Sequence, residues 1–352
     1  MERTGLYFFL LFFLPFVGAL LTTPLISKFA HQKKIVDQPG LHKTHKTSTP
    51  LLGGVSIFLC FAVVLFVFLP LDNKLLSLIL ATIVLVATGL IDDLINIKPL
   101  YKLTGQTIAA LIVVLWNVHL FKFMVDYFAR FYLPETIVII LIIGWVVLMV
   151  NAFNLIDGID GLAAGTAAII FLAMAALSFI EGGRSSVLGV QLIGAGACLG
   201  FLFFNYHPAK IFMGDTGSML LGFILASSHL FAIKYPFSAQ LVLGSMFIFA
   251  YPALDVTYAI YRRICNKSSI FKADKGHIHH VLISLGFSVR KTVVIIYLMN
   301  LIFASIAVIL LSFDISTRAL FVTAICTFIG VVILFRRLLI ISSRNGLSLK
   351  NK

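Results

Sequence analysis

The chain of 352 residues is 60% hydrophobic and 12% charged, and it contains 33 phenylalanines. A soluble globule of this size cannot bury so many apolar side chains and still cover itself with polar groups, so soluble domains, disordered chains and nucleic-acid-binding modules are excluded. At roughly 20 residues per span, the composition predicts an all-α polytopic membrane protein with about 10–11 transmembrane helices. The net charge of +13 then reflects the cytoplasmic bias of Lys and Arg in membrane proteins, and no nucleic-acid partner is expected.

Hydropathy along the chain predicts eleven spans within a single domain, residues 1–352. The first is expected to be a retained span rather than a signal peptide, because no small-residue cleavage site follows it. The spans are expected at residues 6–26, 51–70, 74–91, 103–118, 135–153, 162–180, 186–204, 217–233, 239–261, 292–313 and 317–335.

The distribution of basic residues predicts the orientation of these spans. Of the 27 Lys and Arg residues, 20 fall in one set of loops and 7 in the other. Lys and Arg are retained on the cytoplasmic side, so the richer set is expected to be cytoplasmic, with the N-terminus outside and the C-terminus inside. Most of the unusual acidic residues and histidines fall in the same set, which is expected to form the catalytic face. The set comprises residues 27–50, 92–102, 154–161, 205–216 and 262–291, with the tail 336–352.

Two adjacent carboxylates, Asp92 and Asp93, end the third predicted span. Adjacent negative charges at a membrane boundary repel each other and lose solvation, and an aspartate at a helix C-terminus opposes the helix dipole. A cation, or a phosphate with its metal, would relieve this cost; a solvated helix end is the alternative. Lys102 follows along the chain and suits phosphate as a point charge, whereas Lys98 is expected to be a cytoplasmic anchor.

A second group of polar residues follows the fifth predicted span. Asn154, Asp157 and Asp160 are spaced by three, so they lie near one face if the segment is helical. Gly158 and Gly161 allow a tight backbone or the close approach of a ligand. Amide and carboxylate oxygens are hard ligands that suit Mg²⁺. The alternative is that these residues only cap the end of a helix and bind no metal.

Part of this pattern also occurs in the CDP-alcohol phosphotransferases, which carry an Asp-x-x-Asp-Gly-x-x-Ala-Arg run. Asp157, Asp160, Gly161 and Ala164 fit that run, but Gly165 stands at the arginine position. The later Gly and Asp residues of that family are missing as well. That family is therefore disfavoured.

Residues 204–218 lead into the eighth predicted span. Their Gly-Asp-Thr-Gly-Ser run begins at Gly214 and is typical of a helix start. Backbone amides and the dipole at a helix N-terminus favour anions, so a diphosphate there, with Asp215 holding its metal, is one interpretation. A plain helix cap at Asp215 or Ser218 is the other.

The longest predicted cytoplasmic loop carries three histidines, His277, His279 and His280, after Arg262. Such histidines can donate hydrogen bonds to phosphate oxygens or sugar hydroxyls. A zinc site is the sharper alternative, but no nearby set of Cys and His offers four ligands at the usual spacing. A surface cluster without function is the remaining alternative.

Asp255 lies within the ninth predicted span, behind Tyr251 and Pro252. A charge at membrane depth seeks a partner. We therefore expect Asp255 to orient Arg262 or Arg263.

Taken together, these motifs resemble those of the polyprenyl-phosphate N-acetylhexosamine-1-phosphate transferases, glycosyltransferase family 4. They occur in family order between about residue 45 and residue 280, on the predicted cytoplasmic face. The matching pieces are Thr49-Pro50-x-x-Gly53-Gly54, Asp92-Asp93, Lys102-x-x-Gly105-Gln106, Asn154-x-x-Asp157-Gly-x-Asp160-Gly, Asn205 through Gly-Asp215-x-Gly-Ser, and the His277–His280 cluster.

Within this family, His277-Ile278-His279-His280 after Arg262 and Asp274 resembles the WecA/TagO-like bacterial subgroup. The MraY subgroup, which transfers phospho-MurNAc-pentapeptide, usually has three consecutive histidines after a proline, and Ile278 departs from that pattern. The resemblance implies UDP-GlcNAc as donor, undecaprenyl phosphate as acceptor, UMP as leaving group, and Mg²⁺ or Mn²⁺ as metal. It also implies the bacterial inner membrane as location, and it leaves a homodimer open.

The resemblance further implies roles for individual residues. Asp215, with Asn154 and Asp157, would hold the metal, and Lys102 would hold a phosphate. Asp92 and Asp93, with Asp157, would be catalytic, either by organising the acceptor for direct attack or through a covalent aspartyl-phosphate. The uridine would lie near Asp160, Asn205 and Phe212, and the sugar phosphate near Arg262, His277, His279 and His280.

Three other functions are weighed against this one. An MraY-like transferase keeps the chemistry but takes another donor. A nucleotide-sugar transporter would place its site near the membrane midplane, on discontinuous helices, whereas the acids here gather in the loops of one side. A purely structural membrane scaffold does not account for loop acids in these patterns.

Overall fold

The computed structural model describes residues 2–38, 48–130, 132–180, 186–233, 247–265 and 276–312, together with Gly182, Lys267 and Gly330. The chain divides into two compact units, residues 1–237 and 238–352. Residues 39–47, Asp274, the predicted span 317–335 apart from Gly330, and the predicted tail 336–352 lie outside the described residues.

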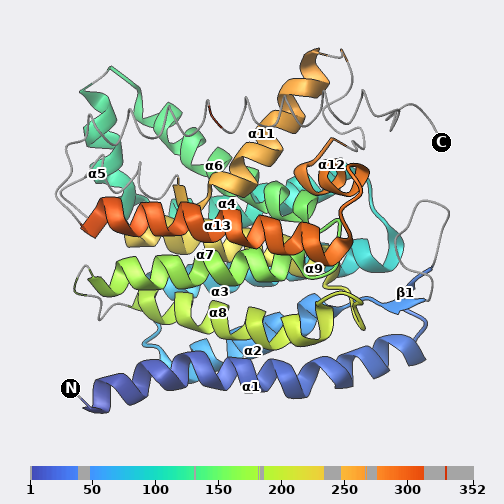
Figure 1. The fold of residues 1–352 in the computed structure, drawn as a ribbon. Helices are drawn as coiled ribbons and strands as arrows, with labels where there is room; N and C mark the ends of the chain where they lie inside the picture. Colours follow the sequence, from blue (N-terminus) through green and yellow to red (C-terminus); the bar gives the residue numbers. More distant parts are fainter. Residues whose placement is uncertain are drawn as a thin grey trace. The chain divides into compact units, whose positions relative to one another are not determined.

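The described part of the first unit consists of nine helices and one short two-stranded sheet (Figure 1). In chain order these are α1 (Glu2–Gln32), β1 (Val36–Asp37), β2 (Thr49–Pro50), α2 (Gly53–Phe68), α3 (Asn73–Ile95), α4 (Pro99–Trp116), α5 (Val118–Ala129), α6 (Glu135–Ile156), α7 (Leu162–Ile180), α8 (Ser186–Asn205) and α9 (Gly214–Ala232).

The described part of the second unit contains α11 (Ala250–Cys265), α12 (Ile278–Ser284) and α13 (Val289–Ser312). Both α11 and α12 pack against α13.

Seven of the described helices are long and apolar enough to cross a membrane. They are α1, α3, α4, α6, α7 and α8 of the first unit and α13 of the second, and α2 is a shorter apolar helix. The sequence-based prediction of an all-α, multi-pass membrane protein is therefore confirmed.

Helix α9 is the buried centre of the first unit. It packs against α2, α3, α6, α7 and α8, and nearly every side chain from Thr216 to Phe231 is buried. Small and hydroxylated residues such as Gly222, Ser227 and Ser228 let neighbouring helices approach closely. Helix α1 lies outside this core, beside α8 and α2 (Figure 1).

A sharp turn between α3 and α4 brings the end of one helix next to the start of the other. Asn96 follows α3 in a left-handed conformation, φ 53°, and its backbone N–H donates to the Asp92 carbonyl at 2.8 Å. Pro99 then begins α4, where its fixed φ suits the first helical turn and no N–H partner is needed. Asp92 and Lys102 are thereby placed at the same end of the two helices.

The segment before α9 is held by backbone hydrogen bonds to the start of α2. In the small sheet, Val36 pairs antiparallel with Pro50. The Pro50 carbonyl accepts from the Phe212 N–H at 2.9 Å, and the Gly53 and Gly54 N–H groups donate to the Phe212 and Met213 carbonyls at 2.9 and 2.8 Å. Since Gly214 follows directly, these bonds fix the position at which α9 begins.

Most predicted spans coincide with helices, and α7 has the predicted limits. The helix start predicted at Gly214 is confirmed, whereas Lys102 and Asn154, which fall within the predicted loops, lie in the terminal turns of α4 and α6. Polar residues at a helix end lower the local hydropathy without ending the helix. Helices α5 and α12 were not predicted, because α5 carries charges and α12 has only seven residues.

Candidate active site

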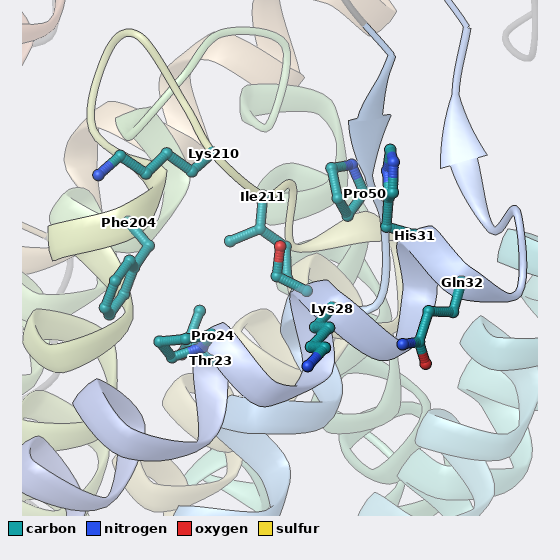
Figure 2. Close-up of a pocket in the computed structure, with 10 residues that line it drawn as sticks. Thr23, Pro24, Lys28, His31, Gln32, Pro50, Phe204, Lys210 and Ile211 are labelled. Atoms are coloured by element: carbon teal, nitrogen blue, oxygen red, sulfur yellow. The ribbon is translucent and has the colours of Figure 1, made fainter.

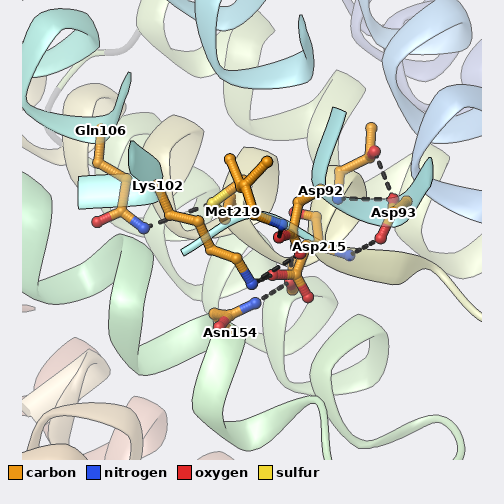
Figure 3. Close-up of polar contacts among 10 residues, drawn as sticks. Asp92, Asp93, Lys102, Gln106, Asn154, Asp215 and Met219 are labelled. Atoms are coloured by element: carbon orange, nitrogen blue, oxygen red, sulfur yellow. Dashed lines mark hydrogen bonds and ion pairs between the residues drawn. The ribbon is translucent and has the colours of Figure 1, made fainter. Parts of the chain in front are cut away.

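Three ionised side chains from three helices meet at one end of the first unit (Figure 3). Asp92 comes from the last turn of α3, Lys102 from the first turn of α4 and Asp215 from the first turn of α9. The Lys102 Nζ lies 2.7 Å from Asp92 Oδ2 and 2.6 Å from Asp215 Oδ2. One ammonium thus bridges two carboxylates that lie 123 residues apart in the sequence.

This bridge is partly sheltered from water. The Asp92 side chain is 7% exposed, whereas those of Lys102 and Asp215 are 22% and 26% exposed. Asp92 is further fixed because its Oδ1 accepts from the Ile97 N–H at 2.9 Å. The buried end of the cluster is therefore rigid, and the Asp215 end is open to a ligand.

The Asp93 carboxylate is engaged differently from its neighbour. Its Oδ1 accepts from the Asp215 N–H at 2.8 Å, and its Oδ2 accepts from the Thr216 N–H at 3.1 Å and the Thr216 hydroxyl at 2.6 Å. It therefore caps the N-terminus of α9 from another helix, where a negative charge is favoured by the helix dipole. Thr216 was not predicted as a site residue.

Glycines allow α9 to begin in contact with α2 and α3. A Cβ on Gly54 would overlap the backbone of Gly217, and one on Gly89 would overlap the Cα of Thr216. Gly214 has φ +69°, in the left-handed region that favours glycine, and a side chain there would also meet the Asp93 carboxylate. The position of Asp215 is thus set by backbone contacts.

Asp92, Asp93 and Asp215 can each offer an oxygen such that all three lie within 4.8 Å of one another. Three carboxylates and one ammonium leave the cluster with excess negative charge when all are ionised. Hard oxygen ligands with excess negative charge suit a divalent cation such as Mg²⁺. The residues that fit a metal best are Asp92 and Asp215, because their Oδ2 atoms already share one cation, the Lys102 ammonium.

The two other predicted metal ligands are placed near the cluster but not within it. The Asn154 Nδ2 donates to the Ser218 hydroxyl at 3.0 Å, on the turn of α9 that carries Asp215. Asp157, directly after α6, is half-buried and is not one of the three carboxylates that meet. Burial raises the pKa of Asp157 well above its usual range, and the charges of Asp215, Asp93 and Asp160 raise it further. The roles of Asn154 and Asp157 as metal ligands stay predictions.

A second group of predicted residues joins two loops of the first unit. The Asn205 side chain is buried; its Oδ1 accepts from the Gly161 N–H at 3.1 Å, and its Nδ2 donates to the Ile211 carbonyl at 2.9 Å. Asp160 Oδ2 accepts from the Ala209 N–H at 3.0 Å and lies 2.7 Å from the His207 Nδ1. Asn205 and Asp160 thus hold the loop after α6 against the segment that leads to Phe212.

A chain of polar side chains that was not predicted as part of the site connects the three helices α4, α6 and α9 next to the acidic cluster. The Asn151 Nδ2 donates to Gln106 Oε1 at 2.6 Å, and the Gln106 Nε2 contacts the Met219 sulfur at 3.4 Å. This chain ties α6, α4 and α9 together one turn from Lys102 and Asp215. The polar residues at helical spacing, Lys102 with Gln106 and Asn151 with Asn154, are the signal that could have revealed it.

The second unit contains the predicted histidines. The His277 Nδ1 lies 2.7 Å from Asp255 Oδ2, and the Ile278 N–H donates to Asp255 Oδ1 at 2.8 Å. The prediction that Asp255 orients Arg262 or Arg263 was therefore wrong, because Asp255 instead fixes the start of α12. Arg262 donates to the Gly276 carbonyl at 3.1 Å.

His279 is fully buried between its two neighbours. Its ring centroid lies 5.8 Å from that of His277 and 4.2 Å from that of His280. The pKa of His279 is lowered to about 3, mainly by burial and also by His280 and His277, with Asp255 acting in the opposite direction. Neither ring nitrogen has a hydrogen-bond partner among the described residues. The ring is held neutral, with its polar atoms unpaired.

Comparison with known proteins shows the family to which the chain is similar. The model of glycosyl transferase family 4 matches residues 75–233. The chain is 34% identical over 302 residues to the probable undecaprenyl-phosphate N-acetylglucosaminyl 1-phosphate transferase of Bacillus subtilis strain 168, an overlap of 86% of this chain and 84% of the relative. The family match over residues 75–233 includes Asp92, Lys102, Asn154 and Asp215.

Two further relatives differ in the substrates that their names give. The undecaprenyl-phosphate alpha-N-acetylglucosaminyl 1-phosphate transferase of Escherichia coli K12 is 30% identical over 291 residues, covering 80% of this chain and 78% of the relative. The phospho-N-acetylmuramoyl-pentapeptide-transferase of Borrelia hermsii is 30% identical over 304 residues, covering 77% and 84%. On this similarity and the family match, the chain belongs to glycosyl transferase family 4, the polyprenyl-phosphate N-acetylhexosamine-1-phosphate transferases.

Proposed function

We propose that this protein transfers GlcNAc-1-phosphate from UDP-GlcNAc to undecaprenyl phosphate, giving undecaprenyl-diphosphate-GlcNAc and UMP. The observation that carries the proposal is the cluster of Asp92, Lys102 and Asp215 at the ends of three helices of a multi-pass membrane protein. The names of the Bacillus and Escherichia relatives support the acceptor and the transferred sugar.

The reaction joins two anions, so its main requirements are charge neutralisation and alignment. Lys102 is the cation of the cluster, and in the proposed complex its ammonium holds a phosphate oxygen. Its two carboxylate partners keep the ammonium charged and aimed at the open, Asp215 side of the cluster. The side chain is thereby fixed before any substrate arrives.

Asp92 and Asp215 would hold Mg²⁺ or Mn²⁺, with Asn154 and Asp157 close to the same turn of α9. Bound there, the cation supplies positive charge that stabilises the diphosphate of the donor and the charge that develops on transfer. Asp93 holds the first turn of α9, so that Asp215 is presented at a fixed position.

The acceptor phosphate attacks the β-phosphate of UDP-GlcNAc directly and in line. A phosphate monoester has its second pKa near 6, so it is mostly dianionic at neutral pH and needs no strong base. Asp92 then orients the acceptor through Lys102. In this proposal Asp93 acts by positioning Asp215, because its two oxygens accept three hydrogen bonds from the first turn of α9.

Donor recognition is assigned to the two joined loops and to the second unit. Asp160 and Asn205 fix the segment that carries Phe212, which would lie near the uridine. Arg262, His277, His279 and His280 would approach the sugar phosphate. The whole site would face the cytoplasm of the bacterial inner membrane, with the N-terminus outside and the C-terminus inside.

The experiment uses the purified full-length protein in detergent, with undecaprenyl phosphate, radiolabelled UDP-GlcNAc and Mg²⁺. We expect label to enter the lipid phase and UMP to be released. EDTA and Asp215→Asn should each abolish transfer. Asp126→Asn, which neutralises an exposed carboxylate on α5, should leave it unchanged.

Other results would change the assignment in defined ways. Transfer from UDP-MurNAc-pentapeptide but not from UDP-GlcNAc would keep the chemistry and make the donor that of the Borrelia relative's subgroup. Absence of transfer with every donor, from protein with a cooperative thermal transition, would overturn the enzyme assignment and favour a nucleotide-sugar transporter. Transfer that survives EDTA would refute the metal site alone.

A further inference from the structure

A pocket of about 600 Å³ lies at the C-terminal end of α1, away from the acidic cluster (Figure 2). One wall is the last three turns of α1, and the other is formed by the end of α8, the segment between α8 and α9, and Pro50 of β2. The residues that line it are Thr23, Pro24, Ser27, Lys28, His31, Gln32, Pro50, Phe204, Lys210 and Ile211. Asp92, Lys102 and Asp215 do not line it.

The polar lining of this pocket is cationic. Lys28 and His31 enter from α1 and Lys210 from the opposite wall, and no carboxylate lines the pocket. In the part of the chain that the structure describes, neither lysine has an ion-pair partner. Both lysine side chains are exposed at the rim of the pocket, where their ammonium groups attract an anionic head group.

The pocket continues into an exposed apolar stripe on the same helix. Leu21 and Leu25 are 66% and 67% exposed, and Lys28 follows at the i+7 and i+3 positions, so the three side chains share one face of α1. Because α1 is long and apolar enough to cross a membrane, this face meets acyl chains. A ligand with an apolar tail and an anionic head matches the stripe and the pocket together, whereas free phosphate would use only the pocket.

We propose that this pocket binds the head group of an anionic phospholipid, with an acyl chain lying along Leu21 and Leu25. The phosphodiester lies in the pocket, attracted by Lys28 and Lys210 at its rim, and Ser27 and Gln32 offer hydrogen bonds to its oxygens. Bulk phospholipid fits this site better than the polyprenyl acceptor, because none of the residues of the acidic cluster reaches it. Its occupancy is independent of the transferase reaction.

The test compares lipid retention by native mass spectrometry on full-length protein given equal amounts of phosphatidylglycerol and phosphatidylcholine. Each basic residue near an anionic lipid contributes enough attraction that we expect an about tenfold preference for phosphatidylglycerol in the wild type. Lys28→Gln with Lys210→Gln should remove this preference. Lys33→Gln with Lys34→Gln, which removes the same charge just outside the pocket, should keep it.

The charge-preserving pair Lys28→Arg with Lys210→Arg should restore the preference, which separates loss of charge from misfolding. The proposal is overturned if the double variant Lys28→Gln/Lys210→Gln keeps the preference for phosphatidylglycerol. It is equally overturned if the double variant Lys33→Gln/Lys34→Gln loses that preference to the same extent. It is also overturned if undecaprenyl phosphate displaces phosphatidylglycerol at equal concentration, since the pocket would then serve the acceptor. Displacement by millimolar inorganic phosphate would assign the site to a soluble anion instead.

Discussion

Asp93 Oδ2 accepts hydrogen bonds from both the hydroxyl and the backbone N–H of Thr216, at 2.6 and 3.1 Å. A helix cap is usually supplied by the residue just before the helix, but here it comes from α3. The neighbouring Asp92 makes the contact with Lys102 instead. Two adjacent aspartates thus have separate contacts, one with Lys102 and one with the helix that carries Asp215.

The cap predicts how Asp93 variants should behave. Asp93→Asn removes the charge and one acceptor oxygen, so we expect a loss of about 1–2 kcal/mol in the free energy of unfolding together with reduced transfer. Thr216→Val removes only the hydroxyl donor and should give a smaller loss of both. Thermal unfolding in detergent and steady-state transfer would be measured on the same preparations.

The separate task of Asp93 would be refuted by one pattern. If Asp93→Asn lost transfer completely while its unfolding transition matched the wild type, Asp93 would be acting on substrate directly. Asp72→Ala is the control, because Asp72 caps the other end of α3 by accepting from the Leu75 N–H at 2.9 Å. It should lower stability without changing the rate of the folded enzyme.

Lys102 occupies the position between two carboxylates that a divalent cation would share. Lys102→Gln should therefore raise the affinity of the protein for Mn²⁺ by about tenfold, because a competing positive charge is removed. The same change should lower transfer by about 100-fold, because the phosphate loses its positioning group. Electron paramagnetic resonance of bound Mn²⁺ and the transfer assay measure these opposite effects.

Lys98→Gln is the control for this experiment, since Lys98 lies directly before α4 and, among the described residues, the cluster's ion pairs are made by Lys102. It should change neither quantity. Equal metal affinity in wild type and Lys102→Gln would show that Lys102 and the metal do not compete for the same oxygens.

Asn205 joins two loops through buried backbone groups. Asn205→Ala leaves the Gly161 N–H and the Ile211 carbonyl without partners, so we expect a loss of about 2–4 kcal/mol in the free energy of unfolding. The KM for UDP-GlcNAc should rise by about tenfold, because the segment leading to Phe212 is no longer fixed. Asn73→Ala, at an exposed position of α3, should affect neither. An unchanged KM would separate this junction from donor binding.

His279 should make the second unit sensitive to acid. Its pKa is lowered from 6.5 to about 3 by burial, with His277, His280 and Asp255 facing it. Below pH 6.5 the unfolded chain binds a proton at this histidine, whereas the folded chain does not bind it until the pH reaches about 3. The free energy of unfolding therefore decreases as the pH is lowered from about 6.5 to about 3. The slope from this one group is at most about 1.4 kcal/mol per pH unit.

His279→Phe removes this titration and also the two unpaired ring nitrogens. We expect the variant to be as stable as the wild type at neutral pH and more stable at about pH 5, while transfer is lost. His119→Phe, at an exposed position of α5, is the control and should retain the acid sensitivity. An unchanged pH profile in His279→Phe would mean that another group causes it.

The sequence predicts helices well where the apolar run itself ends the span. Helix α7 has the limits predicted for it, because charged or glycine residues follow directly at both ends. Helix α6 extends past the predicted end at residue 153 to Ile156, since Asn154 continues the helix while lowering its hydropathy. Site residues were therefore found by motif, but their placement in helical turns was not.

Pairings between distant residues were beyond the sequence. The bond between Asp93 and Thr216 depends on how α3 crosses α9, which hydropathy does not encode. The same applies to Asp255, where the expected partner was an arginine nearby in the chain and the observed partner is His277. In both cases the sequence indicates that a buried carboxylate needs a hydrogen-bond partner. Which residue becomes that partner depends on the folded structure.

The central position of α9 has a consequence for how the protein is made. Helix α9 is not among the helices that qualify as spans by length and composition, and it is surrounded by helices that do. During synthesis it therefore depends on α3, α6, α7 and α8, which emerge earlier, for a protein surface to enter rather than lipid. Its arrival also completes the acidic cluster, because Asp215 lies in its first turn.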